Sequence, residues 1–122
     1  MKTILFVDDE QCVRELIAAT LSRAGRYTFF EAQNADEALE MARRERPDVM
    51  LLDIVMPGLS GLEVCRQLKA DPETRGIKVI MLTALAQESQ RELSQEVGAD
   101  AYFTKPFSPT TLVGKIRELV GV

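Results

Sequence analysis

This chain opens with the stretch ILFVDDE, residues 4–10, in which four apolar residues are followed at once by three acids. Two later apolar runs also end at a charged residue. The run VMLL, residues 49–52, leads directly to Asp53, and AYFT, residues 101–104, leads directly to Lys105. Short apolar runs bounded by polar residues are typical of buried β-strands that reach a loop.

The charged residues that follow these runs favour one shared pocket. If the runs are neighbouring parallel strands, their carboxyl ends gather three carboxylates and one ammonium at one edge of a sheet. These groups belong to Asp8, Asp9, Asp53 and Lys105. Such carboxylates resist simultaneous ionisation unless a cation lies among them. One charge at a strand end is weak evidence because loops are commonly polar, but three such ends indicate a site.

Length and composition indicate one globular domain that spans residues 1–122. Apolar residues make up 46% of the chain and charged residues 28%, which is usual for a folded soluble protein. No apolar run approaches the roughly 20 residues that span a bilayer. Met1-Lys2 leads directly into the first strand-like run, unlike a secretory signal. We therefore expect a cytoplasmic protein with no membrane partner.

The charge of the chain argues against direct binding of nucleic acid. The formal net charge is −4, whereas phosphate contacts need clustered Lys and Arg. In the densest basic cluster, Arg43, Arg44 and Arg46 are interleaved with Glu40 and Glu45. That pattern is typical of a solvated helix face.

The chain contains no histidine, which excludes Ser-His-Asp and Cys-His nucleophile systems and any zinc site with a histidine ligand. The two cysteines, Cys12 and Cys65, lack the spacing of a metal-binding pair. We interpret them as free thiols, buried or half-buried, in a reducing compartment.

Five strands are expected, at residues 3–7, 27–32, 48–52, 78–82 and 101–104. The first, third and fourth are continuously apolar, as in strands that helices cover on both faces. The second is interrupted by Thr28 and Glu31, which favours an edge position.

Segments of helical period lie between the strands. The first helix ends near Gly25, and its expected buried stripe comprises Val13, Leu16, Ile17, Thr20 and Leu21. The fourth helix, at about residues 86–97, has few apolar residues to bury, mainly Ala86, Leu93 and Val97. We expect it to be the least firmly anchored helix.

Capping residues predict where the other helices begin. Asn34 opens the second helix, and Ser60 with Glu63 forms a capping box for the third. Ser108 precedes Pro109 at the start of the last helix. Strict alternation of strand and helix, five times over, predicts a single α/β domain with a parallel sheet and right-handed crossovers.

Four motifs follow the expected strands: VDDE at residues 7–10, LDIVMPG at 52–58, LTA at 82–84 and YFTKPF at 102–107. In this order and spacing they resemble the response regulator receiver family over essentially the whole chain. The resemblance implies a flavodoxin-like (βα)5 fold, with a five-stranded sheet of order 2-1-3-4-5 and helices on both faces.

The resemblance also implies a role in two-component signalling. Asp53 is expected to accept a phosphoryl group from the phosphohistidine of a sensor histidine kinase or a phosphotransfer protein. The chain would be a signalling phosphoacceptor rather than an enzyme, with Asp53, Thr83 and Lys105 assisting its own phosphorylation and dephosphorylation. This is reasonable, since phosphoryl transfer needs mainly positioning and charge neutralisation.

Magnesium is the cofactor that the resemblance implies. Asp9 and Asp53 would bind Mg²⁺ directly together with the backbone carbonyl of Val55, and Asp8 would act mainly through water. Hard oxygen ligands and retained waters suit this small ion. Asp8 has an alternative role as a helix N-cap, and both roles are compatible.

The phosphoryl oxygens would be held by Lys105, Thr83 and the backbone amide of Ala84. Lys105 also has an ordinary interpretation as a surface lysine with a buried stem. The Lys105-Pro106 bond resembles the cis peptide of the family. Gly58 and Gly61 are interpreted as residues that permit the turn after Asp53, because no P-loop motif accompanies them.

Thr83 and Tyr102 are the expected switch residues. The resemblance implies that, on phosphorylation of Asp53, Thr83 moves toward the phosphoryl group and Tyr102 fills the space that Thr83 leaves. The face formed by the fourth helix, fifth strand and fifth helix would then signal to a downstream effector domain or protein. The simpler alternative for Tyr102 is a core aromatic.

Two departures from common family patterns bear on the output. Val55 and Leu85 stand two residues after Asp53 and Thr83, where polar residues in relatives orient an attacking water, so we predict slow loss of the phosphoryl group. Some receivers that dimerise have two acids before the switch aromatic and another early in the last helix, whereas here Asp100 is followed by Ala101 and Thr111 stands at the later position. A phosphorylation-dependent homodimer is therefore left open but is not favoured.

Two other functions are compatible with parts of the pattern. A small Mg²⁺-dependent phosphatase with an aspartyl nucleophile shares the carboxylates, but it needs a substrate pocket that no spare segment provides. A pseudo-receiver scaffold would bind partners without phosphorylation, which the complete set of site residues disfavours.

Overall fold

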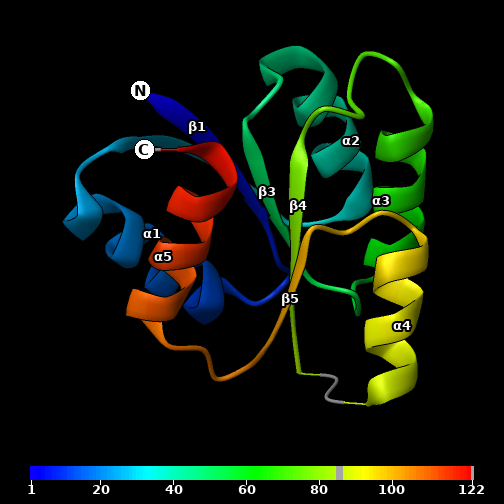
Figure 1. The fold of residues 1–122 in the computed structure, drawn as a ribbon. Helices are drawn as coiled ribbons and strands as arrows, with labels where there is room; N and C mark the ends of the chain where they lie inside the picture. Colours follow the sequence, from blue (N-terminus) through cyan, green and yellow to red (C-terminus); the bar gives the residue numbers. More distant parts are fainter. Residues whose placement is uncertain (85–86, 122) are drawn as a thin grey trace.

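The computed structural model describes residues 1–84 and 87–121 (Figure 1). Strands and helices alternate along the chain. The strands are β1 (Lys2–Val7), β2 (Tyr27–Ala32), β3 (Val49–Leu52), β4 (Lys78–Thr83) and β5 (Ala101–Thr104). The helices are α1 (Gln11–Ala24), α2 (Ala35–Glu45), α3 (Gly61–Ala70), α4 (Glu88–Glu96) and α5 (Pro109–Val120).

The strands form one sheet of order β2-β1-β3-β4-β5, in which every neighbouring pair is parallel. This confirms the predicted order and the predicted edge position of β2. The register places Val7 beside Leu52, and Leu52 beside Met81. The carboxyl ends of the central strands therefore lie at one edge of the sheet, which is where the predicted site requires them.

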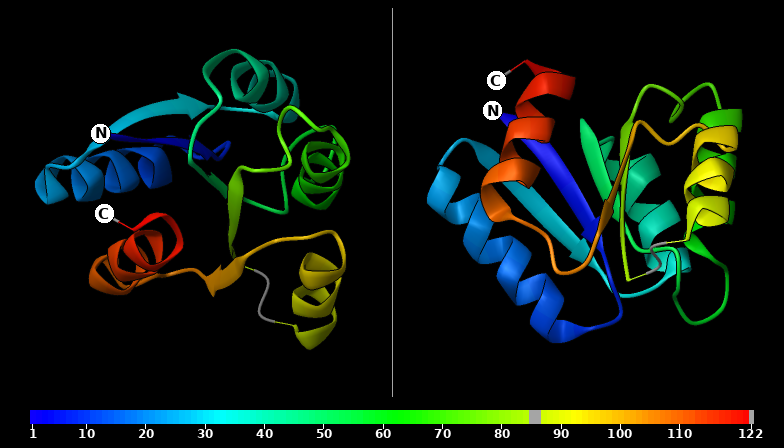
Figure 2. Two further views of the ribbon diagram at one scale, coloured as in Figure 1. Left: turned by 45° about the horizontal axis from the view of Figure 1, so that its top comes forward. Right: turned by 60° about the horizontal axis from the view of Figure 1, so that its bottom comes forward.

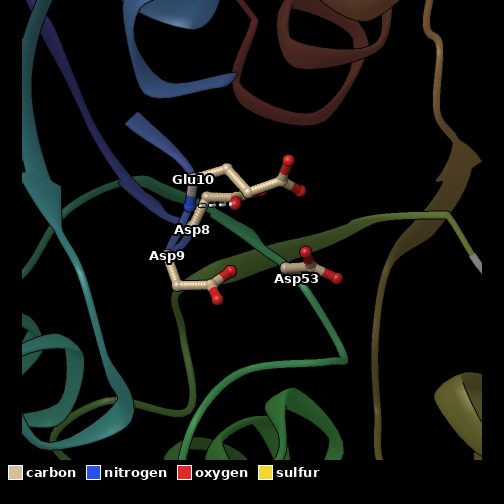
Figure 3. A group of neighbouring side chains, drawn as sticks. All are labelled: Asp8, Asp9, Glu10 and Asp53. Atoms are coloured by element: carbon tan, nitrogen blue, oxygen red, sulfur yellow. Dashed lines mark hydrogen bonds between the residues drawn. The ribbon is translucent and has the colours of Figure 1, made fainter. Parts of the chain in front are cut away.

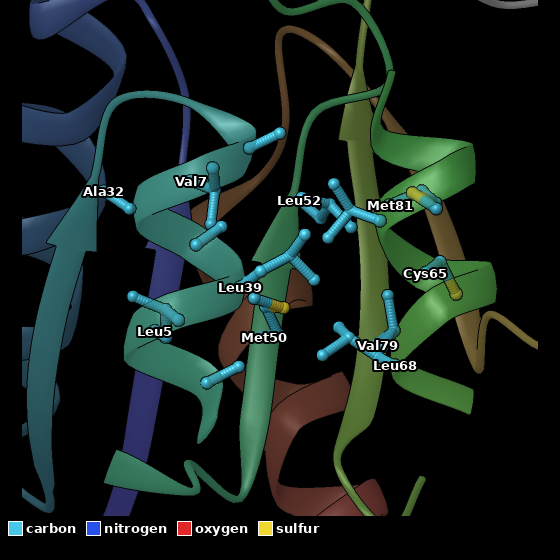
Figure 4. Packing of buried hydrophobic residues seen from close by; sticks show 14 of the residues in the cluster. Leu5, Val7, Ala32, Leu39, Met50, Leu52, Cys65, Leu68, Val79 and Met81 are labelled. Atoms are coloured by element: carbon cyan, nitrogen blue, oxygen red, sulfur yellow. The ribbon is translucent and has the colours of Figure 1, made fainter. Parts of the chain in front are cut away.

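Helices cover both faces of the sheet, as predicted (Figure 2). Along each strand successive side chains point to opposite faces, so Leu5 and Met50 enter one core while Ile4 and Val49 enter the other. Residues of α2 and α3 line the first core, part of which Figure 4 shows. Residues of α1 and α5 line the second.

The predicted capping residues are found at the helix starts. The side chains of Asn34, Ser60 and Ser108 accept hydrogen bonds from backbone amides three residues later. The capping box at α3 is only half formed, because the Glu63 carboxylate pairs with Arg66 on the helix surface. Each cap satisfies one amide that the helix itself leaves without a partner.

Two predicted helix faces differ from the structure by a small rotation. On α1, Leu16 is 49% exposed while Arg14 is 8% exposed. Arg14 tolerates burial because its guanidinium donates hydrogen bonds to the Asp8 carbonyl and to Glu31. On α4, Leu93 is exposed and Ser94 is buried, with its hydroxyl donating to the Gln90 carbonyl.

The predicted start of α4 at Ala86 lies outside the described residues. Ser94 is the single buried residue of α4 among residues 88–96, which agrees with the expectation of weak anchoring. Cys65 is buried, as predicted, but Cys12 is exposed, because it lies on the outer side of the first turn of α1. No helix in residues 1–84 and 87–121 is long and apolar enough to cross a bilayer.

Candidate functional site

The ends of β1, β3 and β5 bring four acids and one lysine together. One carboxylate oxygen from each of Asp8, Asp9, Glu10 and Asp53 lies within 4.8 Å of the others. Figure 3 shows these side chains grouped at the carboxyl edge of the sheet. The gathering of the three aspartates is as predicted, and Glu10 adds a fourth carboxylate.

Lys105 is the cation of this cluster. Its Nζ atom lies 2.6 Å from Asp8 Oδ2, 2.9 Å from Asp53 Oδ2 and 3.7 Å from Glu10 Oε1. The lysine side chain is 14% exposed, so it is not a surface lysine with its ammonium in solvent. The Lys105-Pro106 peptide bond is cis, as predicted.

Burial and charge act against each other in this cluster. Burial raises the pKa of the Asp8 carboxyl, and the hydrogen bonds from Lys105 and the Glu10 amide oppose the rise only in part. Burial also disfavours the charged form of Lys105, but the hydrogen bonds to Asp8 and Asp53 outweigh it and raise its pKa. Lys105 therefore stays protonated at neutral pH, and four acidic side chains lie around this one ammonium.

Local backbone turns orient the two buried aspartates. Asp8 Oδ1 accepts a hydrogen bond of 2.9 Å from the Glu10 amide, and Asp53 Oδ1 accepts one of 3.1 Å from the Val55 amide. Aspartate commonly bonds the backbone two residues on in this way. The N-cap of α1 is Glu10, so the alternative of Asp8 as the helix cap is wrong.

Glycine is required immediately behind Asp53. A Cβ atom on Gly61 would lie 2.0 Å from the backbone oxygen of Asp53, closer than any real carbon approaches. The Gly61 amide donates to the Ile54 carbonyl at 2.9 Å, and Gly58 has a φ of 80°. Both glycines therefore shape the loop after Asp53, as predicted, and α3 begins directly against the backbone of that residue.

The remaining predicted site residues lie on β4 and β5. Thr83 is fully buried at the end of β4, and its carbonyl accepts a 2.8 Å hydrogen bond from the Lys105 amide. Ala84 follows and is exposed. Tyr102 is 9% exposed within the core, and the Arg91 guanidinium lies 4.9 Å from the centre of its ring. Leu85 lies outside the described residues.

The donor set fits a small, hard divalent cation. Asp8 and Asp53 are buried while Asp9 is exposed, so the cluster offers carboxylate oxygens toward an opening to solvent. A cation such as Mg²⁺, which prefers oxygen ligands and keeps several waters, suits this arrangement. Its positive charge would also offset the excess of carboxylates over the single ammonium of Lys105.

Two residues near the site were missed by the sequence analysis. Glu10 stands in the VDDE motif, yet it was assigned no role although its adjacency to Asp9 was the available signal. Arg14 gave no signal, because an arginine within an amphipathic helix is ordinarily solvated. Its burial depends on partners that only the tertiary structure brings together.

Comparison with known proteins identifies the family. Residues 4–117 match the model of the response regulator receiver domain. The chain belongs to this family. It is 47% identical over 119 residues to the phosphate regulon transcriptional regulatory protein PhoB of Pseudomonas aeruginosa, covering 98% of the chain and 52% of that protein. This receiver chain thus spans about half the length of that relative.

Solved structures of receiver proteins share the fold. The chemotaxis protein CheY4 of Vibrio cholerae has a TM-score of 0.90 at 30% identity, with 98% of each chain covered. The receiver domain of the sensor histidine kinase PA1611 from Pseudomonas aeruginosa also has a TM-score of 0.90 at 30% identity, with 99% of this chain and 98% of that chain covered. In the PA1611 structure a magnesium ion is coordinated in the active site cleft.

Proposed function

We propose that this receiver domain, residues 1–122, accepts a phosphoryl group on Asp53 in a Mg²⁺-dependent reaction. The family is a signalling family rather than a family of enzymes. The observation that carries the proposal is the contact of Asp53 with Lys105, 2.9 Å away, inside a cluster of acids. A buried carboxylate held between a cation and a metal-binding cluster suits an acceptor of PO₃.

The proposed donor is a phosphohistidine of a sensor histidine kinase or a phosphotransfer protein. An oxygen of the Asp53 carboxylate attacks phosphorus, the new P–O bond forms as the P–N bond breaks, and the imidazole nitrogen leaves with the bonding electron pair. Lys105 pairs with one phosphoryl oxygen. The Thr83 hydroxyl and the Ala84 amide bind the other oxygens, so that the chain positions the group and offsets its charge.

The residues that would hold Mg²⁺ are Asp9 and Asp53 through their carboxylates and Val55 through its backbone carbonyl, with Asp8 acting through water. The bound ion supplies neutralisation of the charge on the transferring phosphoryl group. The hydrogen bond from the Val55 amide to Asp53 Oδ1 keeps the backbone at residue 55 beside the acceptor. Support also comes from the magnesium ion in the cleft of the PA1611 receiver.

We further infer that the α4-β5-α5 face responds to phosphorylation. The modification adds roughly 1.5 to 2 negative charges at Asp53, and Thr83 and Tyr102 transmit the change. Supporting this, α4 has no side-chain cap at Gln87 and buries Ser94 alone among its described residues. A weakly held helix changes position at low cost, so it suits a switch element.

The proposed setting is the cytoplasm, and the proposed receiver of the signal is an effector domain or a separate protein. The PhoB relative is named a transcriptional regulatory protein, and the present chain covers 52% of it. The net charge of −4 favours an output through protein contacts rather than direct contact of this domain with nucleic acid.

One experiment separates the proposed function from the two alternatives. The protein is incubated with phosphoramidate and Mg²⁺, and the intact mass is compared with that of Asp53→Asn. Accumulation of one phosphoryl group that is lost in the variant supports the receiver function. Rapid consumption of phosphoramidate without accumulation would indicate a phosphatase, and absence of reaction would indicate a scaffold.

A further inference from the structure

We propose that Arg14 is a positioning residue for the metal-binding carboxylates, acting on the acidic turn formed by residues 8–10. The inference deepens the proposed function and rests on its Mg²⁺ role. Arg14 lies in α1, one helical turn beyond the acids, and it touches no group that would transfer the phosphoryl group. Its role is to fix the backbone from which those acids project.

The Arg14 side chain is buried and hydrogen-bonds two separate parts of the chain. Its Nη1 atom donates a buried hydrogen bond of 2.7 Å to the backbone carbonyl of Asp8. Its Nε atom donates at 3.2 Å to Oε1 of Glu31 in the edge strand β2. The Arg14 amide donates to the Glu10 carbonyl at 3.2 Å. The side chain, projecting from the first turn of α1, therefore joins the residue after β1 to the end of β2.

The contact with the Asp8 carbonyl bears directly on Asp9. That carbonyl and the Asp9 amide belong to one planar peptide unit, so a hydrogen bond to the oxygen restrains the backbone from which the Asp9 side chain projects. Within residues 1–84 and 87–121, no hydrogen bond holds the Asp9 carboxylate itself. The position of the Asp9 carboxylate in the site therefore depends on the backbone that the hydrogen bond from Arg14 restrains.

Asp8 and Asp53 are oriented differently. Each has a hydrogen bond from an amide two residues later and a contact with Lys105. Loss of Arg14 is therefore expected to disturb Asp9 more than the other two aspartates. Partners that orient metal ligands from outside the coordination sphere typically contribute roughly 10- to 100-fold to metal affinity.

The test measures the Mg²⁺ affinity of the unphosphorylated protein by titration of backbone amide chemical shifts. In Arg14→Met, which keeps the apolar stem, the Kd for Mg²⁺ is expected to rise about tenfold. Labelling by phosphoramidate is expected to slow at low Mg²⁺ and to return to the wild-type rate at saturating Mg²⁺. Recovery of the labelling rate at saturating Mg²⁺ distinguishes weaker metal binding from a loss of reactivity at Asp53.

The matched control is Glu31→Gln, which removes the ion pair but leaves the hydrogen bond to the Asp8 carbonyl. Its Kd for Mg²⁺ is expected to stay within about twofold of the wild-type value, because the Glu31 carboxylate is 53% exposed and its ion pair with Arg14 is screened by solvent. A rise in Kd as large as that of Arg14→Met would overturn the proposal. The ion pair with Glu31 in β2, rather than the hydrogen bond to the Asp8 carbonyl, would then determine the Mg²⁺ affinity.

Two further results would also overturn it. The first is an unchanged Kd in Arg14→Met together with a lower melting temperature, which would show a purely structural role. If that variant does not fold, Arg14→Gln decides the question. The glutamine amide nitrogen ends where Arg14 Nε lies, so it can keep the contact with Glu31 but does not reach the Asp8 carbonyl. A Kd at least about threefold higher is expected, and an unchanged Kd contradicts the proposal. The second is absence of Mg²⁺ binding in the wild-type protein, which would remove the proposed function as well.

Discussion

The Nζ atom of Lys105 lies 2.9 Å from Asp53 Oδ2, although 52 residues separate the two in sequence and the strand β4 lies between their strands. The same ammonium lies 2.6 Å from Asp8 Oδ2. One lysine thus links the ends of β1, β3 and β5. In the function proposed above, this ammonium also pairs with a phosphoryl oxygen on Asp53.

We expect Lys105→Met to lower the free energy of unfolding by about 3 kcal/mol in Mg²⁺-free buffer, because it leaves two buried carboxylates without their partner. Adding Asp53→Asn should recover at least about 1 kcal/mol of that loss, because one crowded charge disappears. Urea unfolding of the two single variants and the double variant measures this coupling. Strictly additive effects would show that the contact carries no interaction energy.

Lys115→Met is the matched control for that series. Lys115 pairs with Glu118 on the surface of α5, and exposed pairs of this kind contribute at most about 1 kcal/mol. Its free energy of unfolding should stay within about 0.5 kcal/mol of the wild-type value. A cost equal to that of Lys105→Met would point to a general effect of losing positive charge.

Gly61→Ala should destabilise the protein by about 3 kcal/mol, because the added Cβ meets the Asp53 carbonyl at 2.0 Å. Gly114→Ala in α5 is the control, since a Cβ there meets nothing within 4 Å. Alanine favours helix over glycine by roughly 0.5 to 1 kcal/mol, so this variant should gain stability. Thermal unfolding compares the two, and equal effects would contradict the close approach of α3 to Asp53.

The strand ends that build the site could be predicted from sequence. Continuous apolar runs that stop at Asp8 and Asp53 indicate both buried strands and the point where the chain leaves the sheet, and the shorter run AYFT does the same before Lys105. The edge position of β2 was equally visible, because Glu31 interrupts its apolar pattern. Parallel strands bring their carboxyl ends to one edge of the sheet. The apolar runs and the expected sheet topology together therefore predicted the cluster of acids and lysine.

The rotation of α1 could not be predicted in the same way. A stripe through Leu16 and a stripe through Arg14 both fit the helical period around Ile17, and hydrophobicity favours the one with leucine. Burial of Arg14 becomes favourable only when the Asp8 carbonyl and Glu31 supply its hydrogen bonds. Those partners lie in the loop after β1 and in β2, and no local pattern in the sequence of α1 indicates them.

The two thiols should differ sharply in reactivity. Burial raises the pKa of Cys65 to about 11, so almost no reactive thiolate forms there at pH 8, while Cys12 is exposed. Iodoacetamide should therefore alkylate the folded protein once, at Cys12, as peptide mass spectrometry will show. Equal labelling of Cys65 in the folded state would contradict its burial.

The raised pKa of Cys65 also has a consequence for stability. The folded state favours the neutral thiol, so its contribution is complete below the ordinary thiol pKa of 9.0 and is lost as the pH rises toward 11. Cys65→Ser should lack this part of the alkaline decline in the free energy of unfolding. An identical alkaline decline in both proteins would contradict the assignment.

Loss of the phosphoryl group should be slow, because Val55 stands two residues after Asp53 with its side chain 59% exposed beside the site and offers no hydrogen bond to an attacking water. We expect Val55→Asn to shorten the lifetime of the phosphorylated protein severalfold, and Leu85→Glu to act in the same direction. Decay of the phosphorylated mass over time measures both. Lifetimes equal to that of the wild type would contradict a role for these positions.

The position of the phosphoryl group tests the account most directly. The protein is phosphorylated with phosphoramidate and Mg²⁺, the acyl phosphate is reduced with borohydride, which converts the modified aspartate to homoserine, and the peptides are analysed by mass spectrometry. We expect homoserine at residue 53 alone, and none when Mg²⁺ is removed with EDTA. Homoserine at residue 8 or 9, or at residue 53 to the same extent without Mg²⁺, would contradict the account.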